Sequence, residues 1–321
     1  MLKELLEDTA RWFFLYPCRM MIYRLPLRVN YVLGHLMGFA LYHLMREKRK
    51  IMQQELLTIF NEKISRKDVD RIVKKTFSLI SKENIEILLF PRLTPEEVKR
   101  SSVVEGLNHL NKALRENRGV ILLIAHLGNY RFVLPALGYR GYPMNQIGAP
   151  PTVWKELEKN VSRMKARALE FELECERSLP AEFIYYDTFM RPAFGRLARN
   201  EVLVIAGDSV GAGKRIAVDF LNRIAQISIS PFNLARKTGA PLLPVFVIRN
   251  EDNTHTVKIE ERISLPIIKE KEKDEEDNVK RFVQLLEDYV KKYPDHYLKH
   301  LWWVQRRRHV DPVPFMSPRK A

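Results

Sequence analysis

Two short runs of apolar residues without polar alternation dominate the middle of the chain. The first, Val120 to Ala125, follows the turn signal Asn117-Arg118-Gly119, and the second lies within Glu201 to Asp208. Uninterrupted apolar runs of this length are typical of strands buried on both faces, as in a parallel sheet. Each run ends in a polar side chain, His126 or Asp208. In open α/β sheets ligands bind beyond the carboxyl ends of strands, so both side chains are candidates for a functional site.

Strand-like and helix-like patterns alternate from Ser102 onward. We expect strands at residues 103–104, 120–125, 144–148, 183–186, 201–208 and 242–249, an edge strand at 255–263 and a hairpin at 218–229. We expect helices at residues 107–117, 129–138, 154–173, 192–199 and 230–237. The charged run 269–277 is a solvated loop or a helix start, and a helix continues from it to residue 293. This alternation predicts an α/β fold with a mixed central sheet flanked by helices.

The first hundred residues carry helical patterns instead. Ser65 with Asp68 resembles a capping box, and Thr94-Pro95-Glu96-Glu97 combines an N-cap, a proline at the first position and acids in the first turn. We therefore expect an N-terminal helical region over residues 1–100. An α/β domain over residues 101–321 follows it, and the two are expected to form one continuous globular unit.

Part of the helical region has an apolar character that suits a membrane surface. Val29 to Met45 is free of Asp, Glu, Lys and Arg but is shorter than the roughly 20 apolar residues of a membrane span. Arg11 to Tyr23 mixes aromatic and basic residues, which suits the headgroup zone. We expect a core helix or a helix in the membrane interface; an ordinary amphipathic hairpin is the alternative. No signal peptide is expected, because Met1 to Asp8 is acidic.

The composition is that of a folded basic protein. Of 321 residues 46% are hydrophobic and 10% aromatic, enough for a sizeable core, and 54 Lys and Arg against 39 Asp and Glu give a formal charge of +15. This excess favours an anionic partner, whether phospholipid, nucleic acid or an acidic carrier protein. Cys18 and Cys175 match no metal spacing, so a reducing compartment is expected and no metal site is predicted.

The glycine-rich segment Gly207 to Arg215 is not a nucleotide phosphate loop. Gly207 and Gly213 are one residue too far apart for that motif, and Arg215 stands where Ser or Thr would hold magnesium. A basic loop after a strand still suits an anion, so Lys214 and Arg215 are candidate substrate-binding residues.

His126 has two interpretations from local sequence alone. It is placed to act as a base at the end of a strand, or it is a turn histidine that caps the following helix. Gly128 and Asn129 form the predicted turn after it and are candidate substrate contacts.

Several segments of the chain match the blocks of one known family in order. His126-Leu-Gly-Asn-Tyr matches an H-x4-[DE] block in part, and Gly207-Asp208-Ser209 and Val218-Asp219-Phe220-Leu221 match later blocks. Together they resemble the glycerolipid acyltransferases, in the version found in the late acyltransferases of lipid A biosynthesis. Pro231 to Arg249 and Trp303 to Arg307 also match in the family's order, as do Leu25-Pro26 and Gly34 to Tyr42. The resemblance extends over nearly the whole chain.

This resemblance implies acyl transfer from acyl carrier protein or acyl-CoA to a hydroxyl of a membrane glycolipid or lysolipid. It implies His126 as general base, Asp208 and Arg163 as further polar site residues, and no cofactor. It also implies a peripheral or monotopic protein at the cytoplasmic face of the inner membrane, where basic residues contact an anionic surface.

The chain departs from the family pattern five positions after His126, where Arg131 replaces the acid that orients the imidazole. A guanidinium cannot accept the imidazole N–H bond. Three interpretations follow. Another carboxylate orients His126, with Asp208, Asp187 and Asp219 as candidates. Arg131 itself stabilises the thioester oxyanion or binds a phosphate. The chain has lost transfer and retains lipid or carrier binding. Asn222 and Gln305 are smaller departures, in place of a glycine and a terminal histidine.

Three function classes follow from these observations. An acyltransferase is favoured, and a non-catalytic lipid- or carrier-binding protein on the same fold is the alternative. A nucleic-acid binder is suggested only by the charge and by Arg306-Arg307-Arg308, with no accompanying motif, so no nucleic-acid partner is expected.

Overall fold

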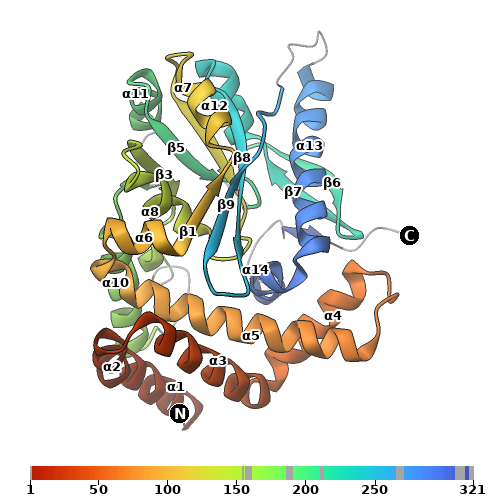
Figure 1. The fold of residues 1–321 in the computed structure, drawn as a ribbon. Coiled ribbons are helices and arrows are strands. Elements are labelled where there is room, and N and C mark those ends of the chain that lie inside the picture. The colour runs from red at the N-terminus through yellow and green to blue at the C-terminus, as the bar shows by residue number, and fades with distance from the viewer. Residues whose placement is uncertain are drawn as a thin grey trace.

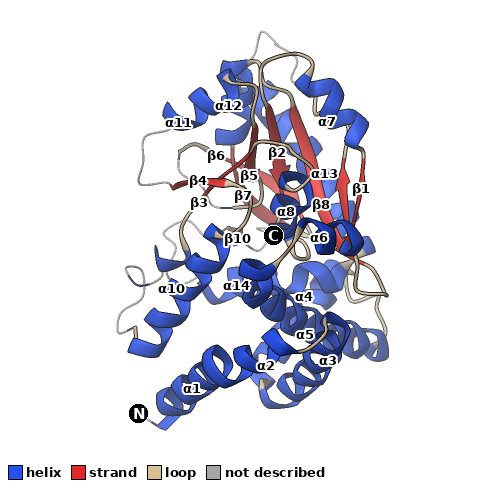
Figure 2. Cartoon of the chain, turned by 60° about the vertical axis from the view of Figure 1, so that its left-hand side comes forward, coloured by secondary structure: helices blue, strands red, loops and turns tan. Residues whose placement is uncertain are grey.

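The structure is a computed structural model that describes residues 2–153, 155, 161–185, 191–209, 213–264, 271–307 and 315–317. Within these ranges it consists of a helical N-terminal region, a mixed central sheet with helices around it, and a small second sheet (Figures 1 and 2). The predicted fold class is confirmed.

The central sheet has seven strands in the order β1-β9-β8-β2-β5-β3-β4. They are β1 (Ser102–Glu105), β2 (Val120–Ile124), β3 (Met144–Gly148), β4 (Glu182–Tyr185), β5 (Val202–Ala206), β8 (Leu242–Arg249) and β9 (His255–Ile259). The β8–β9 pair is antiparallel, and the other neighbours are parallel. The predicted hairpin forms β6 (Arg215–Phe220) and β7 (Arg223–Ser228), which join β10 (Met316–Ser317) in the second sheet.

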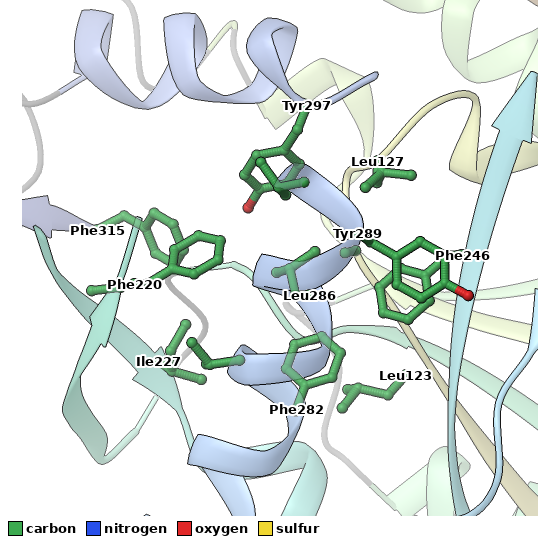
Figure 3. Close-up of a cluster of buried hydrophobic side chains, with 14 of the residues drawn as sticks. Leu123, Leu127, Phe220, Ile227, Phe246, Phe282, Leu286, Tyr289, Tyr297 and Phe315 are labelled. Carbon is green, nitrogen blue, oxygen red and sulfur yellow. The ribbon is translucent and has the colours of Figure 1, made fainter. Parts of the chain in front are cut away.

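Strand β2 lies in the centre of the large sheet and is buried on both faces, as its apolar run predicts. Ile121 and Leu123 face one hydrophobic core, and Val120, Leu122 and Ile124 face the other. The first core includes Phe282, Leu286 and Tyr289 of helix α13 (Lys271–Lys292), which pack between the hairpin and β8 (Figure 3). A strand packed on both faces is held rigidly, so the position of His126, which follows β2, is well defined.

The other described helices after the first strand lie between strands of the sheet along the chain, except α14, which follows α13. They are α7 (Leu107–Leu114), α8 (Val133–Gly138), α10 (Arg163–Arg177), α11 (Arg191–Ala198), α12 (Ser230–Thr238) and α14 (Pro294–Arg307), with the 3-10 helices η3 (Tyr130–Phe132) and η4 (Pro151–Val153). Gly239, at φ +72°, ends α12 as expected of a C-terminal glycine.

Residues 2–101 are mainly helical, as expected. They form α1 (Leu2–Phe13), α2 (Arg19–Arg24), α3 (Leu27–Leu44), α4 (Arg46–Ile59), α5 (Arg66–Leu89) and α6 (Pro95–Ser101), with η1 (Phe14–Cys18) and η2 (Phe90–Arg92). The side chains of Ser65 and Thr94 accept hydrogen bonds from the backbone N–H three residues on, and Thr94 with Glu97 forms a complete capping box. Both predicted helix starts are confirmed.

Helix α5 lies between the sheet and helices α1 to α3 (Figure 1). Helix α3 approaches it closely through Gly38, where an added Cβ would lie 2.5 Å from the Cα of Ser78. The opposite side of α3 exposes an apolar stripe, with Val29, Val32, Leu36 and Phe39 between 41% and 59% exposed. One face of α3 is therefore core, and the other is open. Across the described helices, none combines the length and apolar character that crossing a bilayer requires.

Two predictions change. Strand β9 is not at the edge, because β1 pairs in parallel with its outer side. Its alternating pattern arises because Thr256 and Lys258 line a cavity of about 530 Å³ beside α13. Helix α10 begins at Arg163, and residues 154 and 156–160 of the predicted helix lie outside the described residues.

Candidate active site

The register of two neighbouring strands brings His126 and Asp208 together. In the parallel pair β2–β5, Ile124 lies opposite Ala206. The residues two positions further along each chain, His126 and Asp208, therefore leave the sheet side by side at the same edge. The juxtaposition is a consequence of strand pairing and needs no additional loop structure.

The two side chains form a close hydrogen-bonded pair. His126 Nδ1 lies 2.7 Å from Asp208 Oδ1, and the backbone N–H of His126 donates to Asp208 Oδ2 at 2.8 Å. Burial alone would raise the pKa of the Asp208 carboxyl, but His126 and His300 hold it well below its ordinary value. The carboxylate is fully buried, whereas the His126 side chain is 27% exposed. The geometry thus combines an inaccessible anion with an accessible imidazole.

Helix α14 adds two side chains to this pair. The hydroxyl of Tyr297 donates to Asp208 Oδ2 at 3.0 Å. The His300 ring stacks on the His126 ring with centroids 4.5 Å apart and an interplanar angle of 7°. Burial lowers the pKa of His300 to about 4 against the opposing effect of Asp208, so this imidazole is neutral near pH 7. The Tyr130 and His126 rings make an edge-to-face contact, with their centroids 4.7 Å apart.

His126, Asp208 and His300 place ligand atoms within 4.8 Å of one another, which raises the question of a metal. The nitrogen lone pairs of an imidazole lie in its ring plane. Because these two rings are stacked and nearly parallel, one ion cannot lie in both planes in this arrangement. The described donor set therefore fits a hydrogen-bonded base better than a metal centre.

Arg131 does not take part in the contacts of His126 and Asp208. Its Nε lies 2.7 Å from Glu176 and its Nη2 2.8 Å from Glu172, both on α10, and its Nη1 lies 3.7 Å from Glu83 of α5. The side chain is 13% exposed. Three carboxylates thus surround the guanidinium, and this position ties the loop after His126 to two helices.

The interpretation in which another carboxylate orients His126 agrees with the geometry. Asp208 is that carboxylate among the described residues. Asp219 is exposed on strand β6 of the second sheet, and Asp187 lies outside the described residues. Arg131 therefore does not deprive the imidazole of its partner.

Gly128 and Asn129 hold the loop rather than line open space. The N–H of Gly128 donates to the carbonyl of His296 at 3.0 Å, and a Cβ at Gly128, where φ is +62°, would lie 2.3 Å from the carbonyl oxygen of Val247. Glycine is required by both the angle and the close approach. The Asn129 side chain is 4% exposed, and its Nδ2 donates to Glu86 at 2.8 Å. The expected turn is present, while the amide of Asn129 faces the protein interior.

The other three predicted substrate-binding residues are Arg163, Lys214 and Arg215. Arg163 lies on α10, and the other two lie at the start of β6. Arg163 is exposed at the first turn of α10, next to Ser162, whose hydroxyl bonds Asp8 of α1. Lys214 Nζ lies 2.9 Å from Glu275 of α13, and Arg215 opens strand β6. Residues 210–212 of the glycine-rich loop lie outside the described residues. A role of Arg163, Lys214 and Arg215 in binding stays a prediction.

The two smaller departures have structural roles elsewhere. Asn222 lies in the β6–β7 turn at φ +60°, which asparagine tolerates, and its amide donates to the carbonyls of Thr58 and Ile59 at the end of α4. Gln305 donates to the buried Glu55 at 2.9 Å. The α14 histidine in contact with His126 is His300, five residues earlier.

Sequence reasoning missed Glu86, Tyr297 and His300. His296 and His300 are four residues apart in a helical pattern, so they lie on one face, and this signal was available. Glu86 lies within an ordinary amphipathic helix, and nothing in its neighbourhood in the sequence distinguishes it.

A mixed α/β sheet that presents a histidine–carboxylate pair at adjacent strand ends defines a class of proteins able to activate a hydroxyl. Residues 3–308 match the family described as bacterial lipid A biosynthesis acyltransferase. The chain belongs to this acyltransferase family, and the resemblance seen in its motifs is confirmed.

Two curated relatives are similar to part of the chain. They are the phosphatidylinositol mannoside acyltransferases of Mycobacterium tuberculosis strains CDC 1551 / Oshkosh and ATCC 25618 / H37Rv, each 27% identical over 166 residues. The matched region covers 50% of this chain and 48% of each relative, so the chain spans about half the length of these proteins.

Proposed function

We propose that this protein transfers a fatty acyl chain from a carrier thioester, acyl carrier protein or acyl-CoA, to a hydroxyl of a membrane glycolipid or lysolipid. The observation that carries the proposal is the 2.7 Å contact between His126 Nδ1 and the buried Asp208, beside an exposed imidazole. Family membership supports acyl transfer as the reaction class, and the +15 charge suits both an acidic carrier and an anionic lipid surface.

In the proposed reaction the Nε2 of His126 takes the proton of the acceptor hydroxyl, since its Nδ1 is engaged by Asp208. The hydroxyl oxygen attacks the thioester carbonyl and forms a tetrahedral oxyanion. Collapse of that intermediate forms the ester and releases a thiolate, which recovers the proton from His126. Asp208 holds the productive tautomer and stabilises the imidazolium that forms.

The alternative is a non-catalytic lipid- or carrier-binding protein on the same fold. Its motivating observation is Arg131 in place of the motif acid. Arg131 pairs with Glu172 and Glu176, and Asp208 contacts His126 Nδ1. The replacement of the motif acid by Arg131 therefore leaves His126 with a carboxylate partner. This favours turnover over binding alone.

We further propose that the protein works as a peripheral or monotopic protein at the cytoplasmic face of the inner membrane. Exposed apolar side chains on α1 to α3, among them Trp12, Phe13, Leu36 and Phe39, support insertion into a lipid surface. Exposed Arg24 and Arg28 lie on the same helices, and exposed Arg46 begins α4; all three suit anionic headgroups.

The test is a transfer assay with purified protein, acyl-carrier or acyl-CoA thioesters, and lysolipid or glycolipid acceptors. We expect acylated acceptor with the wild type and none above background with His126→Ala. Transfer that survives His126→Ala would remove this residue from the mechanism. Binding without turnover by the wild type would favour the alternative.

A further inference from the structure

Glu86 of helix α5 connects four separate parts of the molecule. Its carboxylate accepts from the Tyr31 hydroxyl of α3 at 2.7 Å and from the Asn129 amide at 2.8 Å. It also lies 2.5 Å from Arg249 Nη2 at the end of β8 and 3.0 Å from His255 Nε2 at the start of β9. The side chain is 4% exposed. Such a buried carboxylate persists because each of its partners donates to it.

The carboxylate of Glu86 is ionised despite its burial. Desolvation would raise its pKa, but Arg249 and His255 hold that pKa well below the ordinary value for glutamate. The Arg249 guanidinium compensates the charge of Glu86, and the Arg249 side chain is itself 4% exposed. Removing the charge of Glu86 therefore leaves a buried cation without its counter-ion.

The Asn129 contact reaches the loop that carries the proposed base. Residues 126–129, the His126 loop, are attached to three other parts of the molecule. The His126 N–H donates to Asp208, the Gly128 N–H to the His296 carbonyl, and the Asn129 amide to Glu86. Asp208 follows strand β5, and His296 lies on α14. Glu86 belongs to the N-terminal helices, whose outer face is the apolar stripe of α3.

We infer that Glu86 is a positioning residue, which fixes the His126 loop through Asn129 and joins it to the N-terminal helices through Tyr31. This inference rests on the proposed function. Reactive geometry is sensitive to displacements on the order of 1 Å, which can cost about a hundredfold in rate. Freeing the His126 loop from Glu86 is expected to lower the transfer rate more than it lowers substrate affinity.

The experiment compares Glu86→Gln, Asn129→Leu and the double variant in the transfer assay with purified full-length protein. We expect kcat to fall by about tenfold or more in each single variant, with KM changed by less than about twofold. Because both residues act through one hydrogen bond, the double variant should be no slower than the slower single variant. Should Glu86→Gln not fold, Asn129→Leu carries the same expectation.

Glu55→Gln is the matched control. Glu55 is also buried, at 3% exposure, and pairs with Arg223 at 2.7 Å, but it joins α4 to the hairpin instead of the His126 loop. It should lower the melting temperature while leaving kcat per folded molecule unchanged. Equal loss of kcat in Glu55→Gln, or unchanged kcat in both Glu86→Gln and Asn129→Leu, would overturn the inference.

The His126 imidazole provides a readout that is independent of turnover. In a side-chain histidine NMR spectrum of the wild type, the proton on Nδ1 should show the downfield position of a short bond to a carboxylate. Asn129→Leu should shift or broaden this resonance, and Glu55→Gln should not. If the wild type transfers no acyl chain, the proposed function fails, and this spectrum still decides whether Glu86 and Asn129 position His126.

Discussion

The imidazoles of His126 and His300 are in contact, but their environments differ. The His126 Nδ1 contacts Asp208, and the His126 side chain is 27% exposed. The His300 side chain is 9% exposed, and its ring stacks on that of His126. A neutral ring behind the proposed base keeps water from that face and permits a positive charge to form on His126. The two histidines therefore differ in exposure and in hydrogen bonding, although their rings are stacked.

The lowered pKa of His300 predicts a pH-dependent loss of stability. In the unfolded chain His300 takes up a proton near pH 6.5, but in the folded protein it does so near pH 4. The unfolded state thus binds more protons between these values, and the folded state loses stability as the pH falls through that range. The contribution is roughly 3 kcal/mol, because one pKa unit corresponds to about 1.4 kcal/mol.

Urea unfolding at pH 7 and pH 4.5 measures this effect. We expect the stability difference between His300→Phe and the wild type to shift in favour of the variant at the lower pH. A difference that stays constant between the two pH values would contradict the assignment to His300.

Among the elements, helix α10 and the loop after β2 are joined by Arg131. Reversing that charge alone places a carboxylate among Glu83, Glu172 and Glu176, so Arg131→Glu should cost about 3–5 kcal/mol of unfolding free energy. The reversed pair Arg131→Glu/Glu176→Arg should recover roughly 1–3 kcal/mol relative to Arg131→Glu.

Urea titrations of the wild type, both single variants and the double variant form the cycle that tests this pairing. A double variant as unstable as the sum of its singles would mean that the two side chains do not interact. A large gain of transfer activity in Arg131→Glu would instead indicate that position 131 serves His126 directly.

The close approach of α3 to α5 makes a second prediction at this scale. Gly38→Ala adds a Cβ that would lie 2.5 Å from the backbone of Ser78, so the helices must separate, at a cost of roughly 1–3 kcal/mol. Gly195→Ala is the control, because the nearest atom to its added Cβ is the flexible end of Arg199 at 3.7 Å. It lies within helix α11, where alanine is favoured over glycine by up to about 1 kcal/mol. Equal melting temperatures for the two variants would contradict the close packing.

For the molecule as a whole, the sequence predicts the framework better than it predicts the contacts. The apolar runs before His126 and Asp208 identify two buried strands, and the capping signals at Ser65 and Thr94 locate two helix starts correctly. These are local patterns whose physical cause lies within a few residues.

What the sequence does not reveal depends on how distant elements meet. The pairing of His126 with Asp208 follows from β2–β5 register, and no pattern within either strand specifies its neighbour. Glu86 and Arg131 find partners more than 40 positions away. Strand β9 alternates as an edge strand does, but its half-exposed face borders a cavity. The family could be recognised because its motifs are spread along nearly the whole chain and occur in the family's order.

The proposed membrane surface is a property of the whole molecule and can be tested on vesicles. Wild-type protein should co-sediment with anionic vesicles, less so at high salt, since exposed arginines contribute. Leu36→Glu/Phe39→Glu should weaken binding at least about tenfold, because two apolar side chains no longer insert.

Val103→Glu is the matched control for this experiment. Val103 is 56% exposed like the stripe residues, but it lies on β1 of the central sheet. Binding that falls equally in both variants, or that is unaffected by the α3 substitutions, would contradict α3 as the docking face.

The central claim is that His126 acts as a base oriented by Asp208, and the transfer rate of Asp208→Asn tests it most directly. This substitution keeps the size of the side chain but cannot hold the same imidazole tautomer, and a loss of about 10³-fold or more in kcat is expected. Asp219→Asn, at an exposed aspartate on β6, is the control and should retain the wild-type rate. A rate for Asp208→Asn within about tenfold of the wild type would contradict this account.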